Sequence, residues 1–172
     1  MKKIILSLFV LAICCCRGQE IGYLSGVNRI GIDPTRFQPL YGFTVGAKFH
    51  KAMAVETALF YSQRSYRDVI QADYFTFMAM LKLGYFGKKA GVYYCPGISL
   101  NPTLYHSNIK NHTYLSHIQA VGGQIDITPR MLADIKLGYD IGLTGAYFDN
   151  GAYSKYSGPV LMAGLKFRLG KI

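Results

Sequence analysis

Hydrophobic and polar residues alternate along most of this chain with a period of two. In VETALFYSQRSY one face carries Val55, Thr57, Leu59 and Tyr61, and the other face begins with Glu56. Successive side chains of a β-strand point to opposite sides of the sheet, so this pattern predicts a strand with two unlike faces. Eight segments share the pattern: 20–28, 41–49, 53–64, 73–85, 91–100, 117–127, 132–143 and 158–169. The chain is therefore predicted to be all-β.

The connections between these segments alternate in length. HKA, FGKKA and TPRM are short, whereas the other four are longer, among them SYRDVIQA, NPTLYHSNIKNHTYLS and TGAYFDNGAYSKYS. An up-and-down barrel with both chain ends in the periplasm has this order of tight periplasmic turns and longer outer loops. The Greek-key crossings of a soluble sandwich do not alternate so regularly.

The volume of the side chains decides which face points outward. In 132–143, for example, Ile135, Leu137 and Tyr139 lie opposite Asp134 and Gly138. The interior of an eight-stranded barrel is just wide enough to be filled by side chains, so the bulky face does not fit inside. A bulky apolar exterior needs lipid. We predict an eight-stranded antiparallel up-and-down transmembrane β-barrel; the alternative is a soluble barrel that binds an apolar ligand.

Two stretches depart from regular alternation. Pro96 lies within GVYYCPGISL and has no backbone N–H to donate, which predicts a bulge or an end to regular pairing. QAVGGQID changes phase near Gly122 and Gly123, which also predicts a bulge.

The chain begins with MKKIILSLFVLAICCCRGQE, in which two lysines precede an apolar stretch that is too short to span a membrane. We expect residues 1–18 to be a cleaved signal peptide and residues 19–172 to form one outer-membrane β-barrel domain. The alternative is a lipoprotein acylated at Cys14, Cys15 or Cys16. Cleavage would leave Cys95 as the single cysteine, so no disulfide framework is expected.

Composition supports a barrel in a membrane. Hydrophobic residues make up 51% of the 172 residues and aromatic residues 14%, with no tryptophan, yet no run after the amino-terminal segment is long enough for a transmembrane helix. The net charge of +10 would suit nucleic acid, but the export signal and the lack of a basic cluster argue against that partner.

Charged residues on the inward faces are the most informative group. A charge in a narrow barrel must be paired or hydrated, so mixed signs on neighbouring strands predict a network that plugs the lumen, with Glu56 paired to Lys48 or Lys82. A conducting pore is the alternative, although eight strands leave little free bore. The predicted lumen charge network consists of Lys48, Glu56, Arg64, Lys82, Asp126, Asp134, Lys136, Asp140, Lys166 and Arg168.

The sequence offers little for catalysis. Lipid-modifying barrels use serine and histidine near the outer rim, and the candidates here are His106, Ser107, His112, Ser116 and His117. No spacing fixes a serine–histidine–carboxylate arrangement, and adjacent side chains diverge on a strand. The histidines also lack the close spacing of metal ligands. We therefore expect a non-enzymatic protein with no catalytic residue, no cofactor and no metal.

The predicted outer loops are rich in basic and aromatic residues. Arginine and lysine suit the phosphates of lipopolysaccharide, and tyrosine suits the headgroup level of the membrane. An ordinary solvated loop above an aromatic girdle explains the same composition. The residues concerned are Arg29, Arg36, Phe37, Arg67, Tyr105, Lys110, Tyr114, Tyr147, Tyr153, Lys155 and Tyr156.

Three stretches carry a family resemblance: VETALFYSQRSY; YFTFMAMLKLGYF with GVYYCPGISL; and VGGQIDITPRMLADIKLGYDIGL leading to VLMAGLKFRLG. Through them most of residues 20–169 resembles the outer-membrane β-barrel domain family of Gram-negative bacteria, which includes PorT-like proteins. In that family the third strand tends to end in Tyr-Ser, any residue, Arg or Lys, then Gly. Tyr61-Ser62-Gln63-Arg64 matches this motif, and Ser65 replaces the glycine. The resemblance implies that Phe167 takes the part of the family's terminal aromatic assembly signal.

The resemblance implies a location in the cell outer membrane. It also implies outer-membrane lipid, lipopolysaccharide and the barrel-assembly machinery as partners, with secretion-system or envelope proteins as further ones. The first functional hypothesis is a non-enzymatic barrel with a side-chain-plugged lumen that acts through its extracellular loops or as an envelope assembly component. The alternatives are a PorT-like accessory of protein secretion and a lipid A-modifying enzyme.

Overall fold

The computed structural model describes residues 19–29, 31–32, 37–66, 70–105, 113–147 and 153–169. The predicted signal peptide, residues 1–18, lies outside this part of the chain, so cleavage stays a prediction. None of the described residues forms a helix long and apolar enough to cross a membrane.

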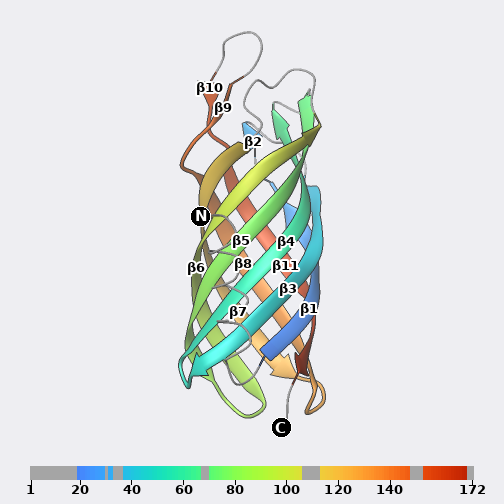
Figure 1. Cartoon of the computed structure of the whole chain (residues 1–172), viewed down its shortest axis with the longest axis vertical. Helices are drawn as coiled ribbons and strands as arrows, with labels where there is room; N and C mark the ends of the chain where they lie inside the picture. The colour runs from blue at the N-terminus through green and yellow to red at the C-terminus, as the bar shows by residue number, and fades with distance from the viewer. Residues whose placement is uncertain are drawn as a thin grey trace, which may run out of the picture.

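Eight long strands form a closed antiparallel barrel (Figure 1). Each strand pairs with the next long strand along the chain, and β1 pairs with β11 over its whole length, from Gln19↔Leu169 to Asn28↔Val160. All eight predicted strands are present, and the barrel is confirmed. The strands are β1 (Gln19–Asn28), β3 (Gln38–His50), β4 (Met53–Tyr66), β5 (Ile70–Phe86), β6 (Ala90–Tyr105), β7 (Thr113–Asp126), β8 (Met131–Gly142) and β11 (Ser157–Leu169).

Short strands accompany the connections at one end of the barrel. β2 (Gly31–Ile32) pairs in parallel with β4 and antiparallel with β11, so it bridges two walls of the barrel. β9 (Ala146–Tyr147) and β10 (Tyr153–Ser154) pair with each other between β8 and β11. The alternation did not predict these short pairs because two residues carry too little pattern.

Tight turns close the opposite end of the barrel. They occupy residues 51–52, 87–89 and 127–130, and β1 begins and β11 ends on this side, the lower end in Figure 1. The prediction of a long connection at 65–72 is wrong. β4 and β5 continue to pair through Ser65↔Gln71 and Tyr66↔Ile70, which leaves only residues 67–69 between them.

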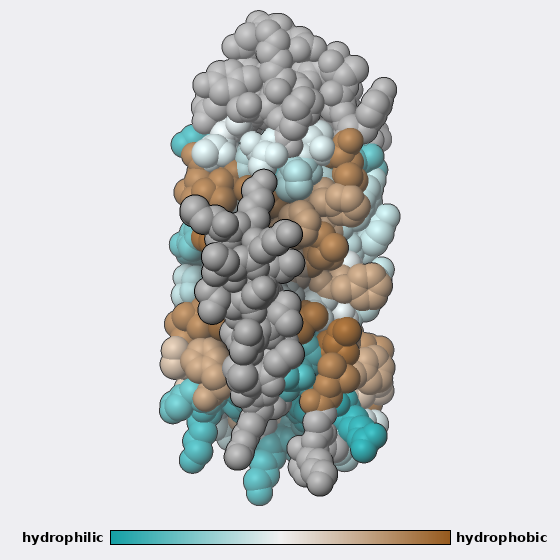
Figure 2. Space-filling model, viewed as in Figure 1, coloured by the Kyte–Doolittle hydropathy of each residue, from teal (hydrophilic) through white to brown (hydrophobic). Residues whose placement is uncertain are grey.

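The two faces of the strands are oriented as predicted. Glu56 is 1% exposed inside the barrel, whereas Leu59, on the other face of β4, is 41% exposed. Aliphatic and aromatic side chains cover the outer wall, and hydrophilic side chains gather at its lower end (Figure 2). The bulky face is therefore the outside of the barrel, as the volume argument requires.

The two predicted irregularities have different outcomes. β5 and β6 pair at Met80↔Gly97 and again at Leu83↔Tyr94 with no register shift, but the positions opposite Cys95 and Pro96 are unpaired. Pro96 therefore interrupts pairing to β5 without a bulge, because proline has no N–H to donate. The bulge predicted at Gly122 and Gly123 is absent, since both residues pair regularly with β6 and β8.

Candidate functional site in the barrel interior

The inward side chains change in chemistry along the barrel axis. From the tight-turn end, the inward residues of β5 are Lys82, Met80, Met78, Thr76 and Tyr74, all of which are buried. β7 follows the same order, from Asp126 through Ile118 and Ser116 to Tyr114, whereas β8 carries a further charged residue, Asp140, in place of the hydroxyl group. Because the strands alternate strictly, each of these layers is built by several walls at once.

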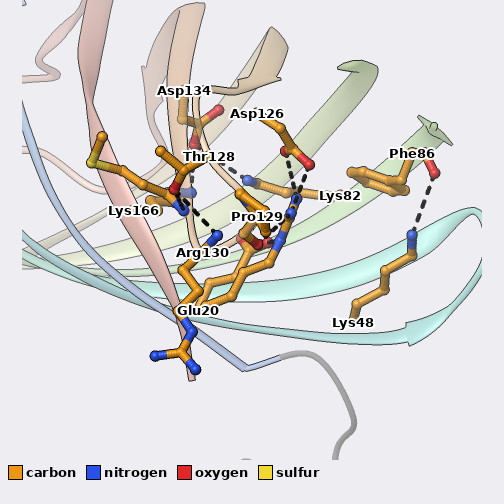
Figure 3. A network of polar contacts seen from close by, with 12 residues as sticks. Glu20, Lys48, Lys82, Phe86, Asp126, Thr128, Pro129, Arg130, Asp134 and Lys166 are labelled. Carbon is orange, nitrogen blue, oxygen red and sulfur yellow. Dashed lines mark hydrogen bonds and ion pairs between the residues drawn. The ribbon is translucent and has the colours of Figure 1, made fainter. Parts of the chain in front are cut away.

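A five-charge cluster forms the charged layer and consists of Glu56, Asp134, Lys82, Lys136 and Lys166. The Lys82 Nζ lies 2.7 Å from Glu56 Oε2 and 3.3 Å from Asp134 Oδ2, and the Lys136 Nζ lies 2.6 Å from Glu56 and 3.1 Å from Asp134. Lys166 also pairs with both carboxylates. Figure 3 shows Lys82 and Lys166 directed towards Asp134. Each of the three lysines therefore pairs with the same two acids, and the cluster as a whole connects β4, β5, β8 and β11.

Tyr93 completes this cluster, although sequence reasoning missed it. Its hydroxyl donates a hydrogen bond to Asp134, and the Lys82 Nζ lies 4.3 Å from the centre of its ring. The cluster holds three ammonium groups against two carboxylates, so the ring face provides part of the remaining stabilisation for the ammonium of Lys82. Tyr93 lies two residues before Cys95 and therefore on the same inward face of β6. The alternation of β6 could have identified Tyr93 as an inward residue.

A second, smaller cluster lies nearer the tight turns. The Arg168 guanidinium donates two hydrogen bonds to Asp126, at 2.6 and 2.7 Å, and its Nε lies 3.7 Å from Glu20. Glu20 was also missed, although it is the cross-strand partner of Arg168. This cluster borders a vestibule of about 320 Å³ at the tight-turn end.

The ten residues of the predicted lumen charge network do not form one network in the described structure. Five of them make the five-charge cluster, Asp126 and Arg168 belong to the second cluster, and the other three lie elsewhere. Lys48 donates a hydrogen bond to the Phe86 carbonyl at 3.5 Å and lies over the Phe86 ring, apart from the five-charge cluster (Figure 3). Asp140 is buried on β8, farther towards the long connections. Arg64 lies on β4, but its side chain falls outside the described residues. Glu56 contacts Lys82 and not Lys48 because Lys82 shares its layer.

Apolar side chains fill the next layer of the interior, on the side of the five-charge cluster that faces the long connections. The volume argument from the sequence placed the bulky side chains outside the barrel, and this layer departs from it. Bulky residues fit because glycines such as Gly42 and Gly164 on neighbouring strands leave room for Phe60 and Leu24, their cross-strand partners. The layer contains Leu24, Phe60, Met78, Met80, Cys95, Ile118 and Met162, and each is at most 5% exposed.

Polar and aromatic groups seal the end towards the long connections. Thr76 donates to Asn101 at 2.8 Å, and Ser99 and Ser116 share a hydrogen bond at 2.6 Å. The rings of Tyr74, Tyr114 and Tyr156 then meet with centroids 5.3 to 6.1 Å apart. The prediction that Tyr114 lies in an outer loop is wrong, because it belongs to β7 and its side chain is buried in the lumen. Tyr156 does lie in the connection just before β11, but its side chain is also buried.

Comparison with solved structures identifies the architecture. Neisserial surface protein A superimposes with a TM-score of 0.71 at 11% identity, over 88% of this chain and 97% of the other. The attachment invasion locus protein of Yersinia pestis, with bound sucrose octasulfate, gives 0.57 at 14% identity over 88% and 97%. A major outer membrane protein from Thermus thermophilus gives 0.57 at 12% identity over 89% and 100%. The chain has the fold of an outer-membrane β-barrel.

No family model matches the sequence, and no curated protein matches it. The side chains of the outer wall independently indicate a membrane protein. An exterior with Phe43 and Val92 each 65% exposed, among many other bulky apolar residues, is stable only against lipid. The barrel therefore crosses a membrane, and with this fold its location is the cell outer membrane.

The candidate catalytic residues do not come together in the described structure. Ser116 is buried in the lumen, where its hydroxyl contacts Ser99 and Asn101. The neighbouring His117 points to the other face of β7, with Nε2 3.2 Å from the Gln119 side chain. His106, Ser107 and His112 lie outside the described residues. Within the described part of the chain, no group of three or more metal-ligating side chains is present.

Proposed function

We propose that this protein is a non-enzymatic, non-conducting outer-membrane barrel whose filled interior makes it a rigid support for its outer loops. The observation that carries the proposal is the continuous filling of the lumen. Lys136, Ile118 and Ser116, from three successive layers, are each 0% exposed. A lumen filled in this way leaves no continuous water path along the axis.

Single-channel recording tests the closed state. The purified barrel in a planar bilayer is expected to give no stable conductance steps. A Phe60→Ala, Met162→Ala variant removes two buried side chains from the apolar layer and is expected to leak. Stable steps from the unmodified protein, as large as those of the variant, would refute the proposal.

The surroundings of Ser116 support a non-enzymatic role. Its hydroxyl contacts only other hydroxyl and amide groups among the described residues, so no base is placed to activate it. Deletion of the gene is expected to leave the mass of lipid A unchanged. A mass shift that is restored by the unmodified gene, but not by Ser107→Ala or Ser116→Ala, would instead establish an enzyme.

For the loop end we propose contact with lipopolysaccharide phosphates. Arg29 and Lys155 are exposed at this end, where cations can pair with phosphate. The structural neighbour from Yersinia pestis binds a sulfated ligand, sucrose octasulfate, which has the same anionic character. Arg29→Gln with Lys155→Gln is expected to lower lipopolysaccharide co-purification, whereas Lys51→Gln with Lys88→Gln, at the tight-turn end, is expected not to.

A PorT-like role in secretion or envelope assembly is the second candidate. The vestibule at the tight-turn end favours it, because Lys48, Glu20 and Asp126 give this opening both signs of charge for a periplasmic protein segment. A photo-crosslinking residue in place of Lys48 is expected to capture secretion-system or envelope proteins. Capture of the barrel-assembly machinery alone would limit its partners to those of its own insertion.

A further inference from the structure

A groove of about 720 Å³ crosses the outer surface of the barrel over β5, β6, β7 and β8. Gly123 forms its floor, because its cross-strand partners Val92 and Ile135 carry side chains and Gly123 does not. A Cβ built on Gly123 would meet only the Gly91 carbonyl oxygen, at 3.7 Å. The missing side chain thus leaves an apolar channel between two rows of exposed aliphatic residues.

The strands that line this groove are joined at the tight-turn end by two turns that carry basic residues. Tyr85, which lines the groove on β5, is 71% exposed. Lys89 follows in the next turn, and its carbonyl accepts a hydrogen bond from the Asp126 N–H at 2.8 Å, which holds the turn beside the end of β7. Arg130 lies in the turn between β7 and β8. Within the described part of the chain, neither Lys89 nor Arg130 pairs with a carboxylate.

We propose that this groove binds one anionic glycerophospholipid from the periplasmic leaflet of the outer membrane. An acyl chain lies over Gly123, and the phosphate lies between Lys89 and Arg130 with the Tyr85 hydroxyl as a further donor. The apolar channel matches a hydrocarbon chain, and the unpaired cations match the charge of the headgroup. The inference rests on the outer-membrane location stated above.

The absence of tryptophan from the sequence makes a clean fluorescence test possible. Tyr94→Trp places the single tryptophan in the groove. Phe49→Trp places it on β3, across the barrel and beside another basic residue, Lys51. Each variant is inserted into bilayers that contain brominated phosphatidylglycerol or brominated phosphatidylcholine, and quenching is measured. The Tyr94→Trp probe is expected to prefer phosphatidylglycerol by about fivefold, the effect of one lysine near a lipid phosphate, and the Phe49→Trp probe is expected to show no preference.

Substitutions separate the headgroup contact from the acyl contact. In the Tyr94→Trp background, Lys89→Gln with Arg130→Gln is expected to bring the preference to one. Gly123→Leu is expected to fill the groove with its side chain and thereby also to abolish the preference for phosphatidylglycerol. Ser25→Leu, an outward small residue on β1, is the matched control and is expected to keep the fivefold preference. Heat-modifiable gel migration shows whether each variant is folded. If Gly123→Leu does not fold, Lys89→Gln with Arg130→Gln still tests the headgroup contact.

Three results would overturn the proposal. Equal quenching by both lipids at the Tyr94→Trp probe would mean ordinary annular lipid. An equal preference at the Phe49→Trp probe would mean general attraction of a basic rim. Absence of quenching by either lipid at the Tyr94→Trp probe alone would mean that a second copy of the barrel covers the groove. Failure of the unmodified barrel to insert into either bilayer would instead refute the membrane function itself.

Discussion

Gly122 and Gly123 are adjacent in the chain and serve opposite faces of the barrel wall. A Cβ on Gly122 would point into the lumen and lie 2.5 Å from the Cζ of Tyr93, whereas one on Gly123 would point outward and lie 3.7 Å from the Gly91 carbonyl oxygen, an ordinary contact distance. Gly122 therefore makes room for the tyrosine that binds Asp134. The two glycines together allow both a packed interior and a grooved exterior.

Gly122→Ala is expected to destabilise the barrel by ~1–3 kcal/mol, the usual cost of overpacking, because the Tyr93 ring must move away from Asp134. Gly123→Ala is the matched control and is expected to stay within ~0.5 kcal/mol, as for other open surface positions. Reversible urea unfolding in lipid vesicles measures both. Equal losses would show that the Tyr93 ring does not rest on Gly122.

The buried carboxylates of the five-charge cluster are each shared by three lysines. Glu56→Gln would leave three buried lysines with a single carboxylate and is expected to cost ~3–5 kcal/mol, as for other broken buried ion pairs. Glu20→Gln removes an acid 3.7 Å from Arg168, whose side chain is partly exposed, and is expected to cost at most ~1 kcal/mol. Urea unfolding compares the two variants, and similar losses would contradict the importance of burial.

At the scale of the strand, strict alternation gives each element a lipid face and a lumen face. Phe77 and Thr76 are neighbours on β5, yet Phe77 is 51% exposed and Thr76 is buried. Pairing tolerates local defects, since the positions of β5 opposite Pro96 and Pro102 are both unpaired, yet one register holds from Tyr74 to Phe86 and shifts only between Asp73 and Tyr74. Alternation of the faces is thus maintained even where hydrogen bonds to the neighbouring strand are missing.

Phe77→Arg places a charge near the middle of β5 on the lipid face. It is expected to cost ~2–4 kcal/mol, because the bilayer centre cannot hydrate the guanidinium. Leu169→Arg, at the end of β11 beside the tight turns, is expected to cost only ~0–1 kcal/mol. Unfolding in vesicles distinguishes the two. A larger loss for Leu169→Arg would place the membrane elsewhere on the barrel.

At the scale of the whole molecule, closure depends on the pairing of the first and last strands. Ser25 on β1 faces Ala163 on β11, and both side chains point outward. This contact joins residues from opposite ends of the sequence, and it removes the open sheet edges that a membrane does not tolerate.

A Ser25→Cys, Ala163→Cys variant is expected to form a disulfide in the folded barrel, because directly opposed residues in antiparallel strands lie within bonding distance. The boiled, unreduced chain would then migrate faster on a gel than the reduced chain. Ser25→Cys with Ile135→Cys is the control, since β11 separates β1 from β8. Crosslinking of the control pair alone would contradict the closure of β1 on β11.

The sequence predicted the barrel well because one rule, the period of two, operates in every long strand. It placed Glu56 inside and Leu59 outside, and it found the inward positions of Lys82, Lys136 and Lys166. It failed where the rule carries no information: the strand ends around residues 65–72, and the inward direction of Tyr114 and Tyr156. Side-chain volume on one strand also does not reveal a glycine on the neighbouring strand, so the bulky apolar layer was unexpected.

The sequence by itself determined the strands, their two faces and the need for lipid, because these depend on local alternation and on the volume of a narrow barrel. Only the tertiary structure decided which charges meet. Glu56 and Lys166 are far apart in the chain, and the stagger of the strands brings them into one layer. The same register places Gly123 between Val92 and Ile135. Register is a property of neighbouring strands, so a single strand's pattern does not contain it.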